Sequence, residues 1–108
     1  MKIRPRRKTP GKMNRWEQSY ADRLELIKMS GGIHSYAYES VRLTLAPSTT
    51  FTPDFLVVTN DEIQFHEVKG QRFAAGMAKF KIAASLYPWA KWIMVEKTKQ
   101  GWKTIMEG

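Results

Sequence analysis

The sequence predicts a single domain that mixes helices and strands, of the α/β or α+β class. At 108 residues, the chain has the length of one ordinary domain. Its apolar residues recur at helical spacing in two segments, and short apolar or alternating runs of strand type lie between and after these segments. The expected order is therefore a helix, three strands, a helix and a strand, with a possible further strand at the end.

The first helix is expected over roughly residues 15–30. Asn14 is a good N-cap, and Glu17 stands three residues later, as in a capping box. The pair Gly31 and Gly32 gives a stop signal. The apolar side chains at helical spacing are Trp16, Tyr20, Leu24 and Ile27.

Three strand segments should follow this helix. Loose alternation over roughly residues 35–45 predicts one strand, broken or bulged near Glu39 and ended by Pro47. A short apolar strand over roughly residues 55–59 and a strand over roughly residues 62–69 flank the turn Asn60-Asp61. The last two strands are therefore expected to form a hairpin.

A second helix is expected over roughly residues 74–87, where Pro88 stops it. A short buried strand over roughly residues 91–96 should follow, and residues 102–106 can add an edge strand. The buried stripe of the second helix is predicted to consist of Met77, Phe80, Ala84 and Tyr87.

The charge of the chain indicates a polyanionic partner. Eighteen Lys and Arg residues face ten Asp and Glu residues, which gives a net charge of +8. Nucleic acid is the first candidate, an anionic membrane surface is the second, and a basic protein without a special partner is the third. Residues 1–13 read as a flexible basic arm or a merely solvating tail, and residues 14–108 as the folded domain.

Two absences narrow the classes of function. No apolar run approaches the roughly 18 residues of a membrane span, so no transmembrane helix is expected. The chain has no cysteine, which excludes disulfides, zinc ribbons and thiol catalysis and fits a reducing compartment.

The candidate site lies on the predicted hairpin. Glu67 and Lys69 are two residues apart and share one face of their strand, while Val68 points the other way into the core. Asp54 begins the partner strand, so the turn should bring its carboxylate close to the Glu67–Lys69 end. Alternatively, the Glu-x-Lys pattern is a solvated surface and Asp54 is an ordinary turn residue.

This combination suits metal-dependent phosphodiester hydrolysis. Asp54 and Glu67 can hold Mg²⁺, a hard cation that prefers oxygen ligands, and the carbonyl of Val68 can add a ligand. The metal neutralises the phosphate and lowers the pKa of a bound water. Lys69 can position that water and stabilise the developing charge.

The segments TPDFLVV and EVKG resemble the motif of the PD-(D/E)xK nuclease superfamily. The chain is similar in particular to small phage-encoded endonuclease-like proteins, related to phage endonucleases that resolve Holliday junctions. The resemblance extends over roughly residues 14–97, including the helix segment 16–26 and the later segments 77–88 and 92–95. It implies a restriction-endonuclease-like α/β core with a mixed central sheet flanked by helices, Mg²⁺ or Mn²⁺ as cofactor, and DNA as substrate.

The resemblance also implies roles for residues outside the hairpin. Glu17 would be a third catalytic acid facing the metal site, although its part in the capping box with Asn14 is a competing role that can coexist. Basic residues in the arm, just after the motif and on the second helix can contact phosphates, or can simply be solvated. These candidates for nucleic-acid binding are Arg6, Arg7, Lys8, Arg72, Lys79 and Lys81.

The sequence therefore predicts a metal-dependent DNA endonuclease, with branched or junction DNA as a possible substrate. The alternatives are a non-catalytic nucleic-acid-binding protein on a nuclease-like fold, and a structural protein whose acids only make salt bridges. A cytoplasmic location is expected, in the host cell if the chain is phage-encoded. A homodimer is a further hypothesis, because resolvase relatives act as dimers and the strand over residues 35–45 can pair with a second copy. The alternative is a monomer that buries this strand in its own sheet.

Overall fold

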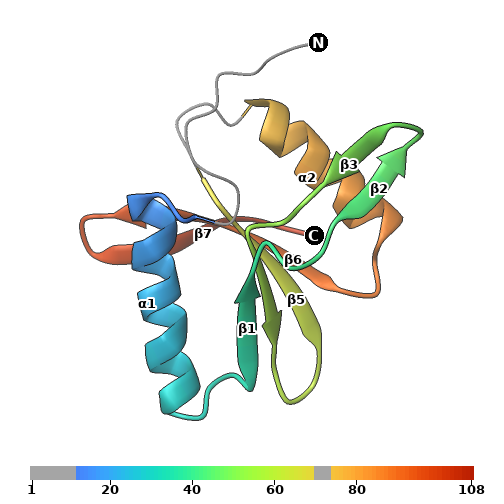
Figure 1. The fold of residues 1–108 in the computed structure, drawn as a ribbon. Helices are drawn as coiled ribbons and strands as arrows, with labels where there is room; N and C mark the ends of the chain where they lie inside the picture. The colour runs from blue at the N-terminus through green and yellow to red at the C-terminus, as the bar shows by residue number, and fades with distance from the viewer. Residues whose placement is uncertain (1–11, 70–73) are drawn as a thin grey trace.

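The computed structural model describes residues 12–69 and 74–108, which form two helices and seven strands. Residues 1–11 of the predicted arm, and Arg72, lie outside the described residues. The elements, shown in Figure 1, are α1 (Arg15–Met29), β1 (Ser35–Tyr38), β2 (Leu43–Ala46), β3 (Thr49–Phe51), β4 (Phe55–Val58), β5 (Ile63–Val68), α2 (Ala74–Leu86), β6 (Lys91–Thr98) and β7 (Gly101–Glu107).

Five strands form one mixed sheet in the order β1-β4-β5-β6-β7, and β2 pairs with β3 in a separate hairpin. All neighbours in the large sheet are antiparallel except β5 and β6, which are parallel. Parallel neighbours need a long crossover connection, and α2 lies within it. The chain is therefore of the mixed α/β type that the sequence predicts.

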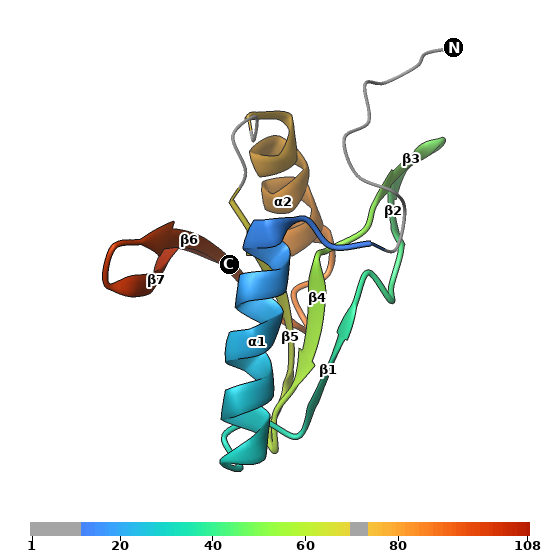
Figure 2. The same ribbon diagram turned by 60° about the vertical axis from the view of Figure 1, so that its left-hand side comes forward.

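The two helices belong to different parts of the core, on opposite faces of the large sheet. Figure 2 shows α1 in front of β4 and β5, with α2 behind and above them. Each helix packs against its own cluster of buried apolar side chains, because alternating strand residues face opposite sides of the sheet. The cluster at α1 contains the strand residues Phe55, Val57, Val68 and Val95. The cluster at α2 contains Leu43, Phe51, Phe65, Trp92 and Met94.

Most predicted elements are confirmed. The helix expected over roughly residues 15–30 is Arg15–Met29, and its capping box between Asn14 and Glu17 is formed. The expected hairpin is present as β4 and β5, with Phe55 opposite His66 and Val58 opposite Ile63. Both the second helix and the last two strands also occur where the sequence places them.

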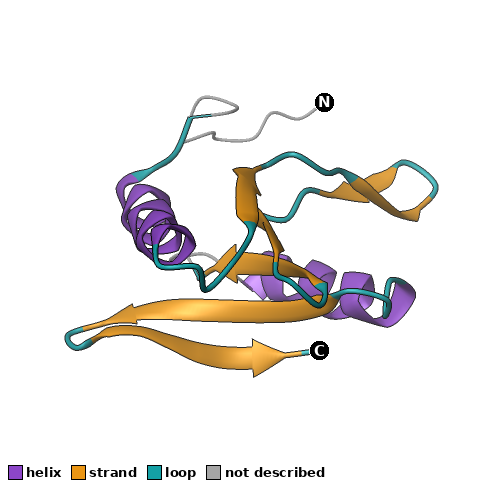
Figure 3. Cartoon of the chain, turned by 90° about the horizontal axis from the view of Figure 1, so that it is seen from below, coloured by secondary structure: helices purple, strands orange, loops and turns teal. Residues whose placement is uncertain are grey.

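The strand expected over residues 35–45 is interrupted near Glu39, as the sequence indicates, but its two parts lie in different sheets. The chain leaves the large sheet after Tyr38, and Glu39 has a φ of +47°, in the left-handed region that interrupts strand geometry. The following residues form β2, which ends before Pro47 as expected but then turns at Ser48 into β3, a strand that the sequence reading missed. Figure 3 shows this hairpin extending away from the large sheet.

The predicted stripe on α2 is confirmed at Phe80, which is fully buried. Met77, Ala84 and Tyr87 are partly buried and pack against the same cluster, and Ala83 is an additional buried residue. In residues 12–69 and 74–108, neither helix has the length and apolarity that a membrane span requires.

Candidate metal centre

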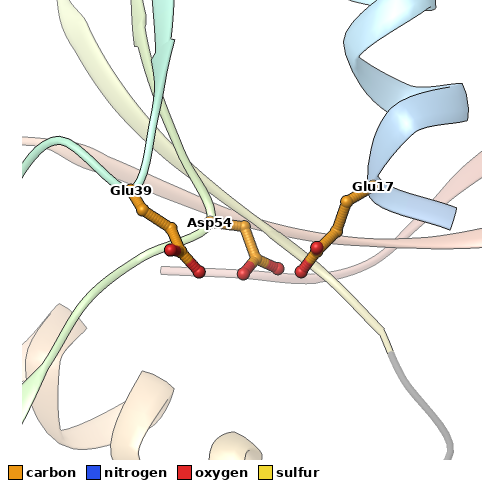
Figure 4. A group of neighbouring side chains, drawn as sticks. All are labelled: Glu17, Glu39 and Asp54. Atoms are coloured by element: carbon orange, nitrogen blue, oxygen red, sulfur yellow. The ribbon is translucent and has the colours of Figure 1, made fainter. Parts of the chain in front are cut away.

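Three carboxylates meet where α1, the end of β1 and the start of β4 come together. One ligand oxygen from each of Glu17, Glu39 and Asp54 lies within 4.8 Å of the other two. Figure 4 shows these side chains turned toward a common point from three different segments of the chain. Because carboxylate oxygens are the ligands that Mg²⁺ and Mn²⁺ prefer, the donor set fits a hard divalent cation.

The capping box fixes the side chain of Glu17. Its Oε1 accepts a hydrogen bond of 3.0 Å from the Asn14 N–H, and its own N–H donates to Asn14 Oδ1 at 2.8 Å. The hydroxyl of Tyr38 donates to the same Oε1 at 2.8 Å. The capping role and the place in the acidic cluster therefore coexist, and Glu17 is only 5% exposed.

Glu39 reaches the cluster because the backbone turns sharply after β1. Its φ of +47° is a conformation that non-glycine residues rarely adopt and that costs of order 1–2 kcal/mol. The Glu39 N–H donates to the carbonyl of Asp54 at 2.9 Å, which holds this turn against the segment before β4. The sequence reading missed Glu39 as a candidate ligand, although it placed a break in the strand at this residue.

Asp54 is joined to the end of β5 by two reciprocal hydrogen bonds. Its Oδ2 accepts from the Val68 N–H at 2.8 Å, and its own N–H donates to Glu67 Oε1 at 3.0 Å. The hairpin therefore brings Asp54 and Glu67 together, at the place where the two strands end. Asp54 is 8% exposed, so its charge is largely removed from water.

Lys69 points its ammonium at a residue that the sequence reading did not identify. Its Nζ lies 2.7 Å from Glu96 Oε2, on the neighbouring strand β6. The hydrogen bond from Lys69 is the main reason that the pKa of the Glu96 carboxyl is lowered. The register of β5 and β6 pairs Val68 with Val95, which places Glu96 directly across from Lys69.

The two predictions for Val68 have different outcomes. Val68 packs into the core with α1, as expected for a residue that faces away from Glu67. The role of its carbonyl as a metal ligand stays a prediction.

The predicted phosphate contacts are only partly within the described residues. Lys79 and Lys81 are exposed on α2, and the Lys79 ammonium donates to the carbonyl of Thr50 in β3 at 3.3 Å. The other predicted contacts, Arg6, Arg7, Lys8 and Arg72, lie outside the described residues.

Repulsion within the acidic cluster is partly offset by a hydrogen-bond donor. Three carboxylates at this distance repel one another, which costs free energy. Tyr38 relieves part of this cost as a donor, because burial and then the hydrogen bond to Glu17 raise the pKa of its hydroxyl far above the usual range.

No protein-family model matches the chain, and no curated protein matches it either, so the interpretation of the site depends on the geometry described above.

Proposed function

We propose that the protein is a metal-dependent DNA endonuclease with a restriction-endonuclease-like core, which hydrolyses phosphodiester bonds. The observation that carries this proposal is the position of Asp54. Its carboxylate lies within reach of Glu17 and Glu39, while its side chain and backbone are hydrogen bonded to the end of the strand that bears Glu67. The net charge of +8 would attract a polyanionic substrate. The acidic cluster would hold the cation that neutralises the reacting phosphate.

The residues would divide the work as follows. Asp54 and Glu67, with Glu17 and Glu39, would hold Mg²⁺ or Mn²⁺, which supplies charge neutralisation and a more acidic bound water. Lys69 would stabilise the negative charge that develops on the phosphate oxygens. Lys79, Lys81 and the basic N-terminal residues would contact phosphates of the DNA away from the reacting bond.

One observation favours the alternative of a non-catalytic nucleic-acid-binding protein. Glu67 accepts a backbone hydrogen bond from Asp54, and Lys69 is paired with Glu96, so both side chains have structural partners. In that alternative the fold and the basic charge would bind DNA, and the acids would only support the loop before β4.

A plasmid-nicking assay distinguishes the nuclease from the non-catalytic DNA-binding protein. The wild-type chain should nick in Mg²⁺ or Mn²⁺ and stop when EDTA is added. Asp54→Asn should bind DNA and fail to nick, whereas Asp61→Asn, which alters an exposed acid in the β4–β5 turn, should nick normally. Binding without nicking by the wild-type chain, with both metals and on every substrate, would favour the alternative.

The preferred substrate and the oligomeric state belong to the same proposal. A panel of linear, flapped and four-way DNA tests the preference for branched substrates. A homodimer would place one active site on each strand of a junction. The strand break after Tyr38 removes the long strand on which pairing of two copies was predicted, although β1 is still an edge strand of the large sheet. Sedimentation with and without junction DNA decides between monomer and dimer.

A further inference from the structure

Two successive residues of β6 hold Lys69. The carbonyl of Val95 accepts a hydrogen bond of 2.8 Å from the Lys69 N–H, which extends the parallel ladder of β5 and β6 by one residue. The carboxylate of Glu96 accepts from the Lys69 ammonium at 2.7 Å. Backbone and side chain of the lysine are thus both fixed to one short stretch of the neighbouring strand.

This ion pair is too exposed to contribute much to stability. The side chains are 28% exposed for Lys69 and 34% exposed for Glu96, and water screens the attraction between charges at that exposure. The pair does restrict the Lys69 side chain, which would otherwise sample many rotamers. An ammonium that must face a reacting phosphate gains from being restricted beforehand.

The chain contains a second pair that provides a comparison. Lys91 and Glu107 also join neighbouring strands, but at 3.2 Å and with side chains 38% and 56% exposed. This pair connects β6 to β7 through residues that the proposed site does not use. It is a matched control for the loss of one carboxylate from a cross-strand ion pair.

We propose that Glu96 is a positioning residue for the reaction, which fixes the orientation of the Lys69 ammonium just past the end of β5. The inference depends on the proposed nuclease function. Glu96 itself touches neither substrate nor metal in this proposal. Its contribution is made through Lys69, so it should vanish when the lysine is absent.

Steady-state cleavage kinetics with Glu96→Gln test the proposal. Loss of the carboxylate charge should lower kcat by about tenfold and change KM by less than about twofold, because misorientation affects the transition state more than DNA binding. Glu96→Asp should recover part of the lost rate, and Glu107→Gln should keep the wild-type rate. Wild-type kcat for Glu96→Gln, or a higher one, would overturn the positioning role.

A double-mutant cycle tests whether the effect passes through the lysine. In a Lys69→Met background, Glu96→Gln should cause no further fall in kcat, whereas an equal further fall would show that Glu96 acts independently. As a readout without DNA, the side-chain ammonium signal of Lys69 in NMR spectra should be sharp in the wild type and broadened in Glu96→Gln. An unchanged signal would also overturn the proposal.

The two proposals fail in different ways. If the wild-type chain cuts no DNA, the nuclease function and the positioning role fall together. If Lys69→Met cuts at the wild-type rate, the lysine has no part in the reaction, and Glu96 has none through it. If Lys69→Met is inactive and Glu96→Gln is normal, only the role of Glu96 is lost.

Discussion

The hydroxyl of Tyr38 donates a hydrogen bond of 2.8 Å to Oε1 of Glu17, and so ties the last residue of β1 to the first turn of α1. The same oxygen receives the Asn14 N–H, so one side of the Glu17 carboxylate is occupied by two donors. Glu17 is thereby oriented by groups that do not themselves belong to the acidic cluster.

Tyr38→Phe should therefore weaken metal binding while the fold persists. Partners that orient a ligand typically change metal affinity by about 10–100-fold when they are removed, and we expect a loss of about tenfold. Titration of free Mn²⁺ by its EPR signal measures this affinity. Tyr36→Phe, which removes a hydroxyl bonded to Glu25, is the control and should bind Mn²⁺ normally.

Substitutions of Asp54 should differ in stability although all of them abolish cutting. Asp54→Ala leaves the buried N–H of Val68 without its acceptor, which should lower the free energy of unfolding by about 1–3 kcal/mol. Asp54→Asn keeps an acceptor oxygen and removes one of the three clustered charges, so it should be at least as stable as the wild type. Urea unfolding in EDTA compares the two variants, and equal stabilities would mean that this hydrogen bond contributes nothing.

Glu39→Gln should stabilise the metal-free protein and reduce its response to metal. Removing one of three mutually repelling carboxylates should raise the free energy of unfolding in EDTA by about 1 kcal/mol. The rise in Tm on adding Mn²⁺ should become smaller than in the wild type. Thermal unfolding with and without metal checks both effects. A loss of stability in EDTA, or an unchanged rise with Mn²⁺, contradicts the inclusion of Glu39 in the centre.

The free energy of unfolding should fall as the pH drops from about 6.5 to about 4. Burial, with a smaller effect of Arg23, lowers the pKa of His66 from 6.5 to about 4, and its Nδ1 is 2.7 Å from the Tyr20 hydroxyl. Between these values the unfolded chain binds a proton that the folded chain does not, so acid favours unfolding. The full effect is about 3 kcal/mol, since one pKa unit corresponds to about 1.4 kcal/mol.

Urea unfolding between pH 4 and 7 in EDTA, in variants of each histidine, isolates this contribution. His66→Gln removes the titrating group and should flatten the pH dependence. His34 is exposed, so His34→Gln should keep the wild-type slope. If His66→Gln kept the wild-type pH dependence, the effect would belong to another titrating group.

Deletion of residues 1–12 should weaken DNA binding and make it less dependent on salt. Each phosphate contact that is lost lowers the slope of log affinity against log salt by about 0.9 on duplex DNA. The deleted basic residues are Lys2, Arg4, Arg6, Arg7, Lys8 and Lys12. Fluorescence anisotropy across a salt series measures the slope. A slope equal to that of the full chain would mean that the segment only increases solubility. Lys79→Gln removes one positive charge from α2 and gives the change in slope for a single lost charge.

Local patterns predicted the elements whose signals lie within a few residues. The capping pair Asn14 and Glu17 marks the start of α1, and the turn between β4 and β5 fixes their register and hence the contact between Asp54 and Glu67. Both depend on short-range chemistry that alternation and turn residues report directly.

The sequence did not predict features that depend on the tertiary arrangement. Nothing in the alternation around Tyr38 shows that the next residue adopts a left-handed φ and sends the chain into a separate hairpin. The sequence also gives no sign of the contact between Glu96 and Lys69, because this contact depends on the parallel register of two strands separated by a helix. Lys69 and Glu96 come together only because strands that are distant in the sequence pair in the sheet.

The acidic centre draws its oxygens from α1, from the turn after β1 and from the segment before β4, which are far apart along the chain. If a cation binds there as proposed, an unfolded chain would have to close two long loops to restore the site, so chelation would be lost with the fold. Cation affinity is then coupled to cooperative folding, and the resistance of the protein to unfolding would rise with the free concentration of the ion. Depletion of that metal would thus shorten the lifetime of the protein as well as stop the proposed reaction.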